Sequence, residues 1–126
     1  MNRLSISIVL YDTPIVIASK TLNDLSTAVM KAQEDKLIGR ATVAIINNSQ
    51  DQSVVNQLVK NYANSCLSLR LLQNTNNVGY GAAHNQSILT ETSDYHLVLN
   101  PDAFLSKEAL AVAINHLKTH PEVAMI

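Results

Sequence analysis

Asp102 is a side chain whose position in the sequence suggests chemistry. It closes the triplet Asn100-Pro101-Asp102, which directly follows the apolar run Tyr95–Leu99. Proline fixes φ, so the backbone largely sets the direction of the Asp102 side chain. A carboxylate beside a diphosphate can hold Mg²⁺ or Mn²⁺, because the ion takes its other ligands from phosphate and water. We therefore expect Asp102 to bind a divalent cation, with a purely structural turn as the alternative.

Two closely spaced glycines, Gly79 and Gly81, come before a stretch of helical spacing. They match the first two glycines of the dinucleotide fingerprint, but His84 stands where the third would be, and the motif follows a third strand rather than the first. Glycines at the start of a helix let the backbone approach a ligand and leave N–H groups free for an anion. Phosphate binding and a plain flexible turn are both consistent with this pattern.

Asn47 and Asn48 follow another apolar run. A side-chain amide both donates and accepts hydrogen bonds, so these residues could read the edge of a nucleotide base. They could equally cap the helix that follows.

Other metal-binding and nucleophilic residue types show no such pattern. Histidines 84, 96, 116 and 120 lack the spacing of metal ligands, and sequence order supports no Ser–His–Asp arrangement. We expect His96 to be buried with its hydrogen bonds satisfied, and histidines 116 and 120 to lie at the surface. Cys66 is the only cysteine, which excludes an internal disulfide and a multi-cysteine zinc site.

Apolar runs alternate with stretches of helical spacing along the whole chain. The predicted strands are Ser5–Leu10, Thr42–Ile46, Leu67–Leu72 and Tyr95–Leu99, and Val123–Ile126 is expected to begin a fifth. The predicted helices start at Pro14, near Val54, after Gly79 and after Ser106. We expect Asp12 or Thr13 to cap the first helix and Ser106 to cap the last, with Pro121 ending it. The buried stripe of the first helix should consist of Ala18, Leu22, Leu25, Val29 and Ala32.

This alternation predicts an α/β fold, with a mostly parallel sheet between two layers of helices in a Rossmann-like, three-layer arrangement. Right-handed crossovers bring the carboxyl ends of all the strands to one edge, where ligands of open α/β sheets bind. Polar clusters fall at that edge four times, at residues 11–12, 47–49, 74–81 and 100–102. Their convergence predicts a binding site.

Composition limits the classes of function. The 126 residues make one domain, with 47% hydrophobic and 15% charged residues and a net charge of −1, which argues against a basic nucleic-acid-binding face. No apolar run approaches the roughly 20 residues of a membrane span, and no signal peptide is evident, so we expect a cytoplasmic protein. Because the last residues begin a buried strand, we expect this domain to be the front part of a longer protein.

Four sequence runs together resemble a known family: SIVLYD, VAIINNSQD, NTNNVGYGAAHNQSI and SDYHLVLNPDAFL. They are similar to the inverting family 2 glycosyltransferases of the GT-A fold, especially to bacterial rhamnosyltransferase-like members that build surface polysaccharide. The resemblance covers essentially the whole chain in order. It implies that this domain binds a nucleoside-diphosphate sugar.

The resemblance also implies roles for individual residues. Leu10 and Tyr11 would border the base, and Asn47 replaces an aspartate that hydrogen-bonds the pyrimidine. Asn77, Gly79 and Gly81 would form the loop over the nucleotide, with Asn85 fixing that loop to its helix. Asn100 and Asp102 replace the metal-binding D-x-D motif and keep only its last carboxylate.

A full enzyme of this kind would transfer a sugar, for example rhamnose from dTDP-rhamnose or a hexose from a UDP-hexose, with inversion. The acceptor would be a polysaccharide or a lipid-linked glycan, and the enzyme could work peripherally at the inner face of the membrane. The catalytic base is expected beyond residue 126, so these residues alone should be inactive and, with an unpaired sheet edge, prone to self-association. The alternative is a non-catalytic α/β module that binds a nucleotide or a protein.

Overall fold

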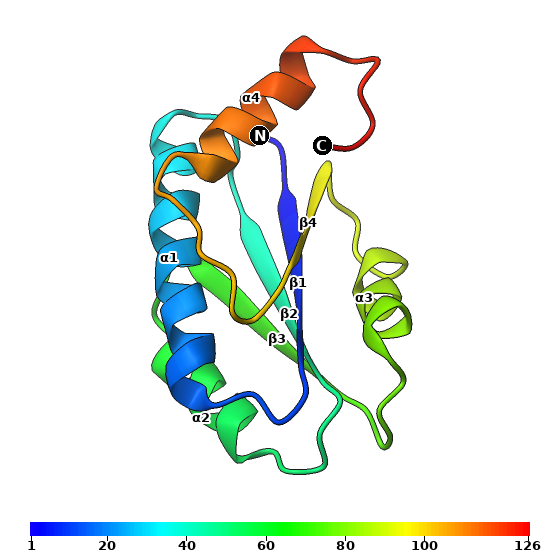
Figure 1. Ribbon diagram of the computed structural model, residues 1–126. Coiled ribbons are helices and arrows are strands. Elements are labelled where there is room, and N and C mark those ends of the chain that lie inside the picture. The colour runs from blue at the N-terminus through cyan, green and yellow to red at the C-terminus, as the bar shows by residue number, and fades with distance from the viewer.

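A computed structural model describes all residues, 1–126, and has four strands and four helices in strict alternation (Figure 1). The elements in chain order are β1 (Leu4–Leu10), α1 (Ile15–Glu34), β2 (Ala41–Asn47), α2 (Ser53–Asn61), β3 (Leu67–Gln73), α3 (Tyr80–Ile88), β4 (Tyr95–Leu99) and α4 (Ala109–Thr119). The four predicted strands are confirmed, three of them one or two residues longer than expected. None of the helices combines the length and apolar character needed to cross a membrane.

The strands form one sheet in the order β3-β2-β1-β4, with every pair parallel. In its register Leu10 lies beside Asn47, and Asn47 lies beside Gln73. On the other side of β1, Ile8 lies beside Leu99, the last residue of β4. The carboxyl ends of all four strands therefore meet at one edge, as the alternation predicts.

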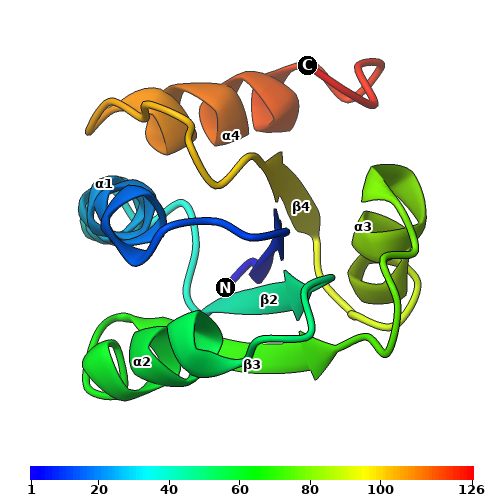
Figure 2. The ribbon, with the colours of Figure 1, turned by 60° about the horizontal axis from the view of Figure 1, so that its bottom comes forward.

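Helices cover both faces of the sheet, which confirms the three-layer α/β/α architecture. Helices α1, α2 and α4 lie on one face and α3 alone lies on the other (Figure 2). The larger core joins α1, α2 and α4 to alternate residues of β1, namely Leu4, Ile6, Ile8 and Leu10. The predicted stripe of α1 is fully buried in that core. The smaller core under α3 consists of Val9, Ala44, Ile46 and Ala83.

Two helix starts differ from expectation. Pro14 occupies the N-cap of α1 instead of its first turn, and no side chain caps this helix. The hydroxyl of Thr13 instead accepts the Tyr11 amide (3.3 Å), because the chain turns sharply after β1. Helix α4 begins at Ala109 after Glu108, so Ser106 does not cap it, and the Ser106 carbonyl accepts the Ala109 amide in a tight turn.

The prediction of a fifth strand at Val123–Ile126 is wrong. After α4 ends at Thr119, the chain makes a turn and these residues pair with no strand. A strand needs a neighbour to accept and donate its backbone hydrogen bonds, and the apolar pattern alone does not provide one. Consequently β4 remains an edge strand, with Val98 exposed upon it.

Candidate functional site

Four loops meet at the carboxyl edge of the sheet and form a continuous rim, defined here as residues 11–14, 47–52, 74–79 and 100–105. Hydrogen bonds join these segments in turn: the Asp12 amide donates to Ser49 Oγ (2.6 Å), Asn48 Nδ2 donates to the Gly79 carbonyl (3.4 Å), and the Tyr80 hydroxyl at the start of α3 donates to Asn100 Oδ1 (2.7 Å). The polar clusters that the sequence assigned to one edge are therefore bonded to one another.

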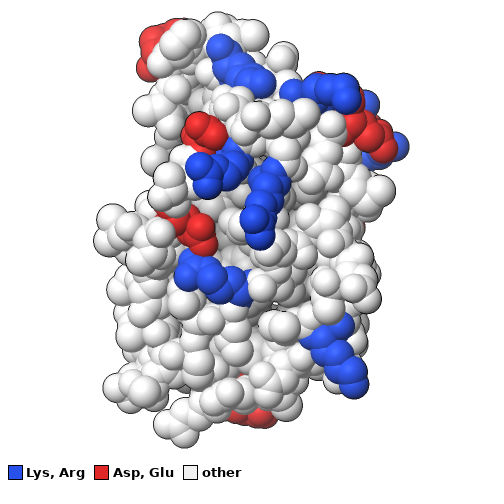
Figure 3. Space-filling view, turned by 180° about the vertical axis from the view of Figure 1, so that it is seen from behind, with Lys and Arg blue, Asp and Glu red and all other residues white.

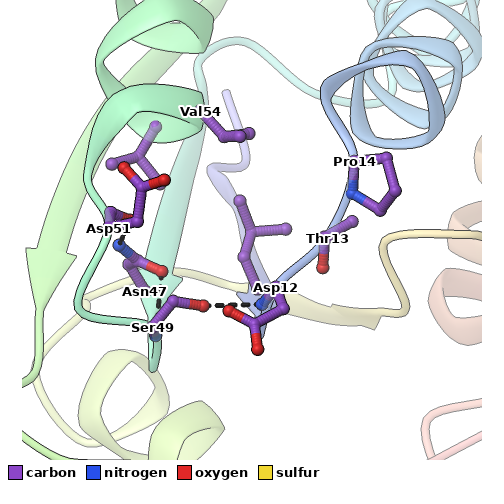
Figure 4. A pocket seen from close by; sticks show the side chains of 9 residues that line it. Asp12, Thr13, Pro14, Asn47, Ser49, Asp51 and Val54 are labelled. Carbon is purple, nitrogen blue, oxygen red and sulfur yellow. Dashed lines mark hydrogen bonds between the residues drawn. The ribbon is translucent and has the colours of Figure 1, made fainter.

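A pocket of about 300 Å³ opens in the rim between the start of α1 and the start of α2 (Figure 4). Its lining consists of Leu10, Asp12, Thr13, Pro14, Asn47, Ser49, Asp51, Val54 and Val55. The lining combines apolar side chains with amide, hydroxyl and carboxylate groups. The predicted site residues Leu10 and Asn47 thus lie in the same pocket.

Asn47 is buried at the base of this pocket, with 2% of its surface exposed. Its Nδ2 group donates both hydrogens within the protein, to the Asp51 carbonyl (3.1 Å) and to Gln73 Oε1 (2.8 Å). Its Oδ1 accepts the Ser49 amide (3.1 Å) and keeps one lone pair free. Asn47 can therefore only accept a hydrogen bond from a ligand, whereas the sequence suggested that it could also donate.

Neither Asn47 nor Asn48 caps α2, which removes that alternative. Asp51 Oδ1 accepts the Ser53 amide at the start of the helix (2.9 Å). This hydrogen bond lowers the pKa of the Asp51 carboxyl below its usual value, and the side chain therefore stays charged at neutral pH.

A second hollow of about 360 Å³ adjoins the first and shares Asp12, Ser49 and Asp51 with it. Tyr11 and Asn77 also line this hollow, so two more predicted site residues lie beside the first pocket. Tyr11 is 58% exposed, which leaves its ring free to contact a ligand.

The loop before α3 is held by amide side chains. Asn77 Oδ1 accepts the Gly79 amide (2.9 Å), and Asn74 exchanges a pair of hydrogen bonds with Gln86 on α3 (2.9 and 3.1 Å). The predicted anchor, Asn85, is exposed and its side chain makes no hydrogen bond to this loop. The neighbouring Gln86 instead fixes the loop to the helix, because its half-buried side chain hydrogen-bonds Asn74.

The two glycines differ in what the backbone requires. Gly79 has φ of +87°, a conformation that residues with a side chain rarely adopt. Gly81 has no such requirement, and a Cβ atom there would meet nothing within 4 Å. The backbone conformation therefore explains the glycine at position 79, but the fold does not explain the glycine at position 81.

Asp102 lies in a tight turn at the end of β4, closed by a hydrogen bond from the Ala103 amide to the Asn100 carbonyl (3.2 Å). Its side chain is exposed and makes no hydrogen bond within the protein. Asn100, two residues before Asp102, connects this turn to the rest of the rim, because its Oδ1 accepts the Tyr80 hydroxyl.

The chain offers no group of three or more His, Cys, Asp or Glu side chains that could hold a metal ion. Asp102 provides a free carboxylate at the rim, as does the exposed Asp12, whose side chain also makes no hydrogen bond within the protein. A single carboxylate of this kind suits a cation that takes most of its ligands from phosphate and water. These residues fit a cation that arrives with a diphosphate, and they do not fit a closed metal site formed by the protein alone.

The rim is acidic. Its four segments contain Asp12, Asp51 and Asp102 and no Lys or Arg. On the face seen from behind, Lys and Arg side chains lie mainly in the upper and middle parts, interspersed with Asp and Glu, and the lower part of the view is mostly uncharged (Figure 3). A diphosphate bound at this rim would need a positive charge that these loops do not supply.

Two histidines, His84 and His96, contact serines of β1 and are not part of the rim. His96 on β4 contacts Ser5 Oγ (2.6 Å) and Ser7 Oγ (2.8 Å), and His84 Nδ1 contacts Ser7 Oγ (2.7 Å). Burial lowers the pKa of both histidines, assisted at His84 by His96 and partly opposed at His96 by Glu91. The neutral form is therefore favoured in both rings, of which His84 is buried and His96, expected to be buried, is half-buried.

The model of the family described as glycosyl transferase family 2 matches residues 16–126. The chain belongs to glycosyl transferase family 2. Among curated proteins none matches this family 2 chain.

Solved structures share the fold of this family 2 chain. One is S. aureus TarS 1-349, with 23% identity over 94% of the chain and a TM-score of 0.73, also solved in complex with UDP. Another is the mannosyltransferase PcManGT from Pyrobaculum calidifontis in complex with GDP-Man and Mn²⁺, with 18% identity over 92% of the chain and a TM-score of 0.74. The family 2 chain spans about a third of each of these proteins (33% and 32%).

Two residues that join the loops, Ser49 and Tyr80, fall inside the polar clusters predicted at residues 47–49 and 74–81, but the sequence predicted no individual role for them. Gln73 ends an apolar strand and orients Asn47, which only the register of β2 and β3 reveals.

Proposed function

We propose that this chain is the donor-binding domain of a glycosyltransferase and that its rim binds the nucleoside diphosphate of a nucleotide sugar. The observation that carries the proposal is the hydrogen-bonded continuity of the rim, which runs from the pocket containing Asn47 to the turn that presents Asp102. Family membership gives the reaction class, sugar transfer.

The base would occupy the pocket of about 300 Å³, with its faces against Leu10, Pro14 and Val55. The free lone pair of Asn47 Oδ1 favours a base with an N–H at that point, as in the imide of uracil or thymine. Cytosine presents an acceptor at the same ring position and would leave two acceptors facing each other. Uridine and thymidine diphosphates are therefore the expected nucleotides.

The diphosphate would follow the rim past Asn77 and the Gly79–Gly81 segment toward Asp102. Mg²⁺ or Mn²⁺, held there by Asp102 and the diphosphate, would supply the positive charge that the acidic loops lack. Asp102 binds and orients at this point, while Asn100, fixed by Tyr80, shapes the turn. Gly81 would allow the diphosphate to approach the backbone closely, since the fold itself does not require a glycine there.

The full protein would transfer the sugar with inversion, in one displacement at the anomeric carbon. The base that deprotonates the acceptor would lie outside residues 1–126, so this chain would bind the donor without completing transfer. Rhamnose or another hexose is the proposed sugar, and a polysaccharide or lipid-linked glycan at the inner face of the membrane is the proposed acceptor.

Calorimetry tests the proposal. UDP and dTDP are titrated into the chain with Mn²⁺ and again with EDTA, beside CDP as the base control. We expect binding of UDP or dTDP that needs Mn²⁺ and that D102N weakens at least about tenfold. E122Q, the same change at an exposed carboxylate after α4, should leave affinity unchanged. Absence of binding, or equal binding in EDTA, would contradict the proposal, and the latter would favour a non-catalytic nucleotide-binding module.

A further inference from the structure

We propose that Thr21 of α1 is a positioning residue that holds the backbone on both sides of Asp102, an inference that rests on the donor-binding function proposed above. The Thr21 hydroxyl lies 2.5 Å from the Pro101 carbonyl and 3.2 Å from the Ala103 carbonyl. These carbonyls belong to the residues immediately before and after Asp102. One side chain, distant by 80 positions in sequence, therefore contacts both neighbours of the candidate cation ligand.

Thr21 is 2% exposed, and its position is unusual for a polar side chain. It lies on the core-facing side of α1 next to Leu22, and its hydroxyl hydrogen goes to the loop instead of to its own helix. A buried hydroxyl without a partner is costly, so the contact restrains the loop as well as Thr21.

Three backbone carbonyls of the turn around Asp102, those of Asn100, Pro101 and Ala103, accept hydrogen bonds. The Asn100 carbonyl accepts the Ala103 amide (3.2 Å), while the next carbonyl and the one after Asp102 face Thr21. Pro101 adds a fixed φ. The backbone is thus held at each peptide, and the Asp102 carboxylate is left exposed and free to bind.

Helix α1 supports the same segment at two further points within one helical turn of Thr21. Asp24 Oδ2 accepts the Leu105 amide (3.5 Å), and the Lys20 ammonium lies 4.6 Å from the centre of the Phe104 ring. Residues 101–105 therefore follow the surface of α1 closely. Thr21 is the buried member of this set and the one that contacts the turn itself.

Three variants test the inference. T21V removes the hydroxyl at almost constant shape, T21S retains it, and T27V makes the matched change on the exposed side of the same helix, where Thr27 bonds only within the helix. For each we propose measuring Mn²⁺-dependent UDP binding and hydrogen exchange at the Ala103 amide. T21V should weaken binding about 3- to 10-fold and speed exchange at Ala103, whereas T21S and T27V should match the parent chain.

A double-mutant cycle with D102A shows whether Thr21 acts through Asp102. If it does, T21V should cause no additional loss of affinity in the D102A background. An additive loss, or T21V binding equal to that of the parent chain, would overturn the inference.

The failure of the proposed function gives a different result. In that case the parent chain itself shows no Mn²⁺-dependent UDP binding. Exchange at Ala103 then still decides whether Thr21 holds the turn, because that amide bonds to Asn100 whether or not a ligand is bound. Unchanged exchange in T21V would contradict the positioning role, and faster exchange would support it independently of the nucleotide.

Discussion

The hydroxyl of Tyr80 donates to Asn100 Oδ1 across 2.7 Å and thereby joins the start of α3 to the end of β4. The two residues are 20 positions apart, and β4 is bonded to β1, not to the loop before α3. This contact closes the rim, because it connects the loop around Gly79 to the turn that carries Asp102. Loss of this hydrogen bond should therefore weaken binding at the diphosphate end of the nucleotide.

Y80F tests this closure. Phenylalanine keeps the edge-on contact with the His84 ring, whose centroid lies 4.4 Å away, and loses only the hydroxyl. We expect Mn²⁺-dependent UDP affinity to fall about 3- to 10-fold with little change in stability, because Tyr80 is half exposed. Y95F, at the opposite end of β4, is the matched control. Equal affinity in Y80F and the parent chain would show that the closure is irrelevant to binding.

Replacing Asn47 by aspartate should destabilise the fold. The Asp51 carbonyl and Gln73 Oε1 would lose their donor and face a buried negative charge. We expect a loss of about 2–3 kcal/mol in the free energy of unfolding at pH 7, measured by urea denaturation. The loss should shrink in acid, where a protonated aspartic acid can donate again. N56D, on the exposed side of α2, should cost far less, and a similar cost for both variants would contradict the network described here.

Gly81 provides a test that separates binding from folding. A methyl group there meets open space, and alanine is the better helix former, so G81A should leave stability unchanged or raise it by up to about 1 kcal/mol. If the backbone at 81 approaches the diphosphate, the same variant should lower UDP affinity. Calorimetry with unchanged affinity would remove Gly81 from the site.

The buried His84 and the half-buried His96 predict the pH dependence of stability. Burial lowers the pKa of His84 and His96 in the folded chain, so between the usual histidine pKa of 6.5 and the lowered folded values the unfolded chain binds protons that the folded chain does not. Stability should therefore be complete above about pH 7 and fall as the pH drops below 6.5, by up to about 1.4 kcal/mol per pH unit for each such proton.

Urea denaturation between pH 7.5 and 5.5 measures this slope. H96Q should flatten it, because one of the two histidines with a lowered pKa is gone, while H116Q at the exposed end of α4 should not. A slope that H96Q leaves intact would assign the acid sensitivity to other groups.

Much of the fold follows from patterns that are local in sequence. The apolar runs identified all four strands, and the stripe from Ala18 to Ala32 identified the buried face of α1, because side-chain periodicity directly reflects burial. The prediction of a fifth strand was wrong because strand pairing depends on residues distant in sequence, which a local apolar pattern does not reveal. The expected cap of α1 was also wrong, because Pro14 occupies the N-cap and its side chain has no hydrogen-bonding group.

The site shows the same difference between what local sequence patterns predict and what depends on contacts between distant residues. Placing Asn47, Gly79 and Asp102 at one edge required only parallel strands and right-handed crossovers, and the structure bears this out. The contacts that orient these residues, such as Gln73 to Asn47 and Thr21 to the Asp102 turn, join elements distant in sequence. No spacing rule connects such positions, so only the three-dimensional arrangement identifies them.

The most direct test of the central claim is the location of bound Mn²⁺. With UDP present, a small amount of Mn²⁺ is added to the isotope-labelled chain, and the broadening of each amide signal by the paramagnetic ion is measured by NMR. The signals of Gly79 and Ala103 should disappear first, those of Gly39 and Asp94 at the opposite edge of the sheet should persist, and D102N should abolish the effect. Broadening centred away from the rim, or unaltered in D102N, would contradict the assignment of this edge as the donor site.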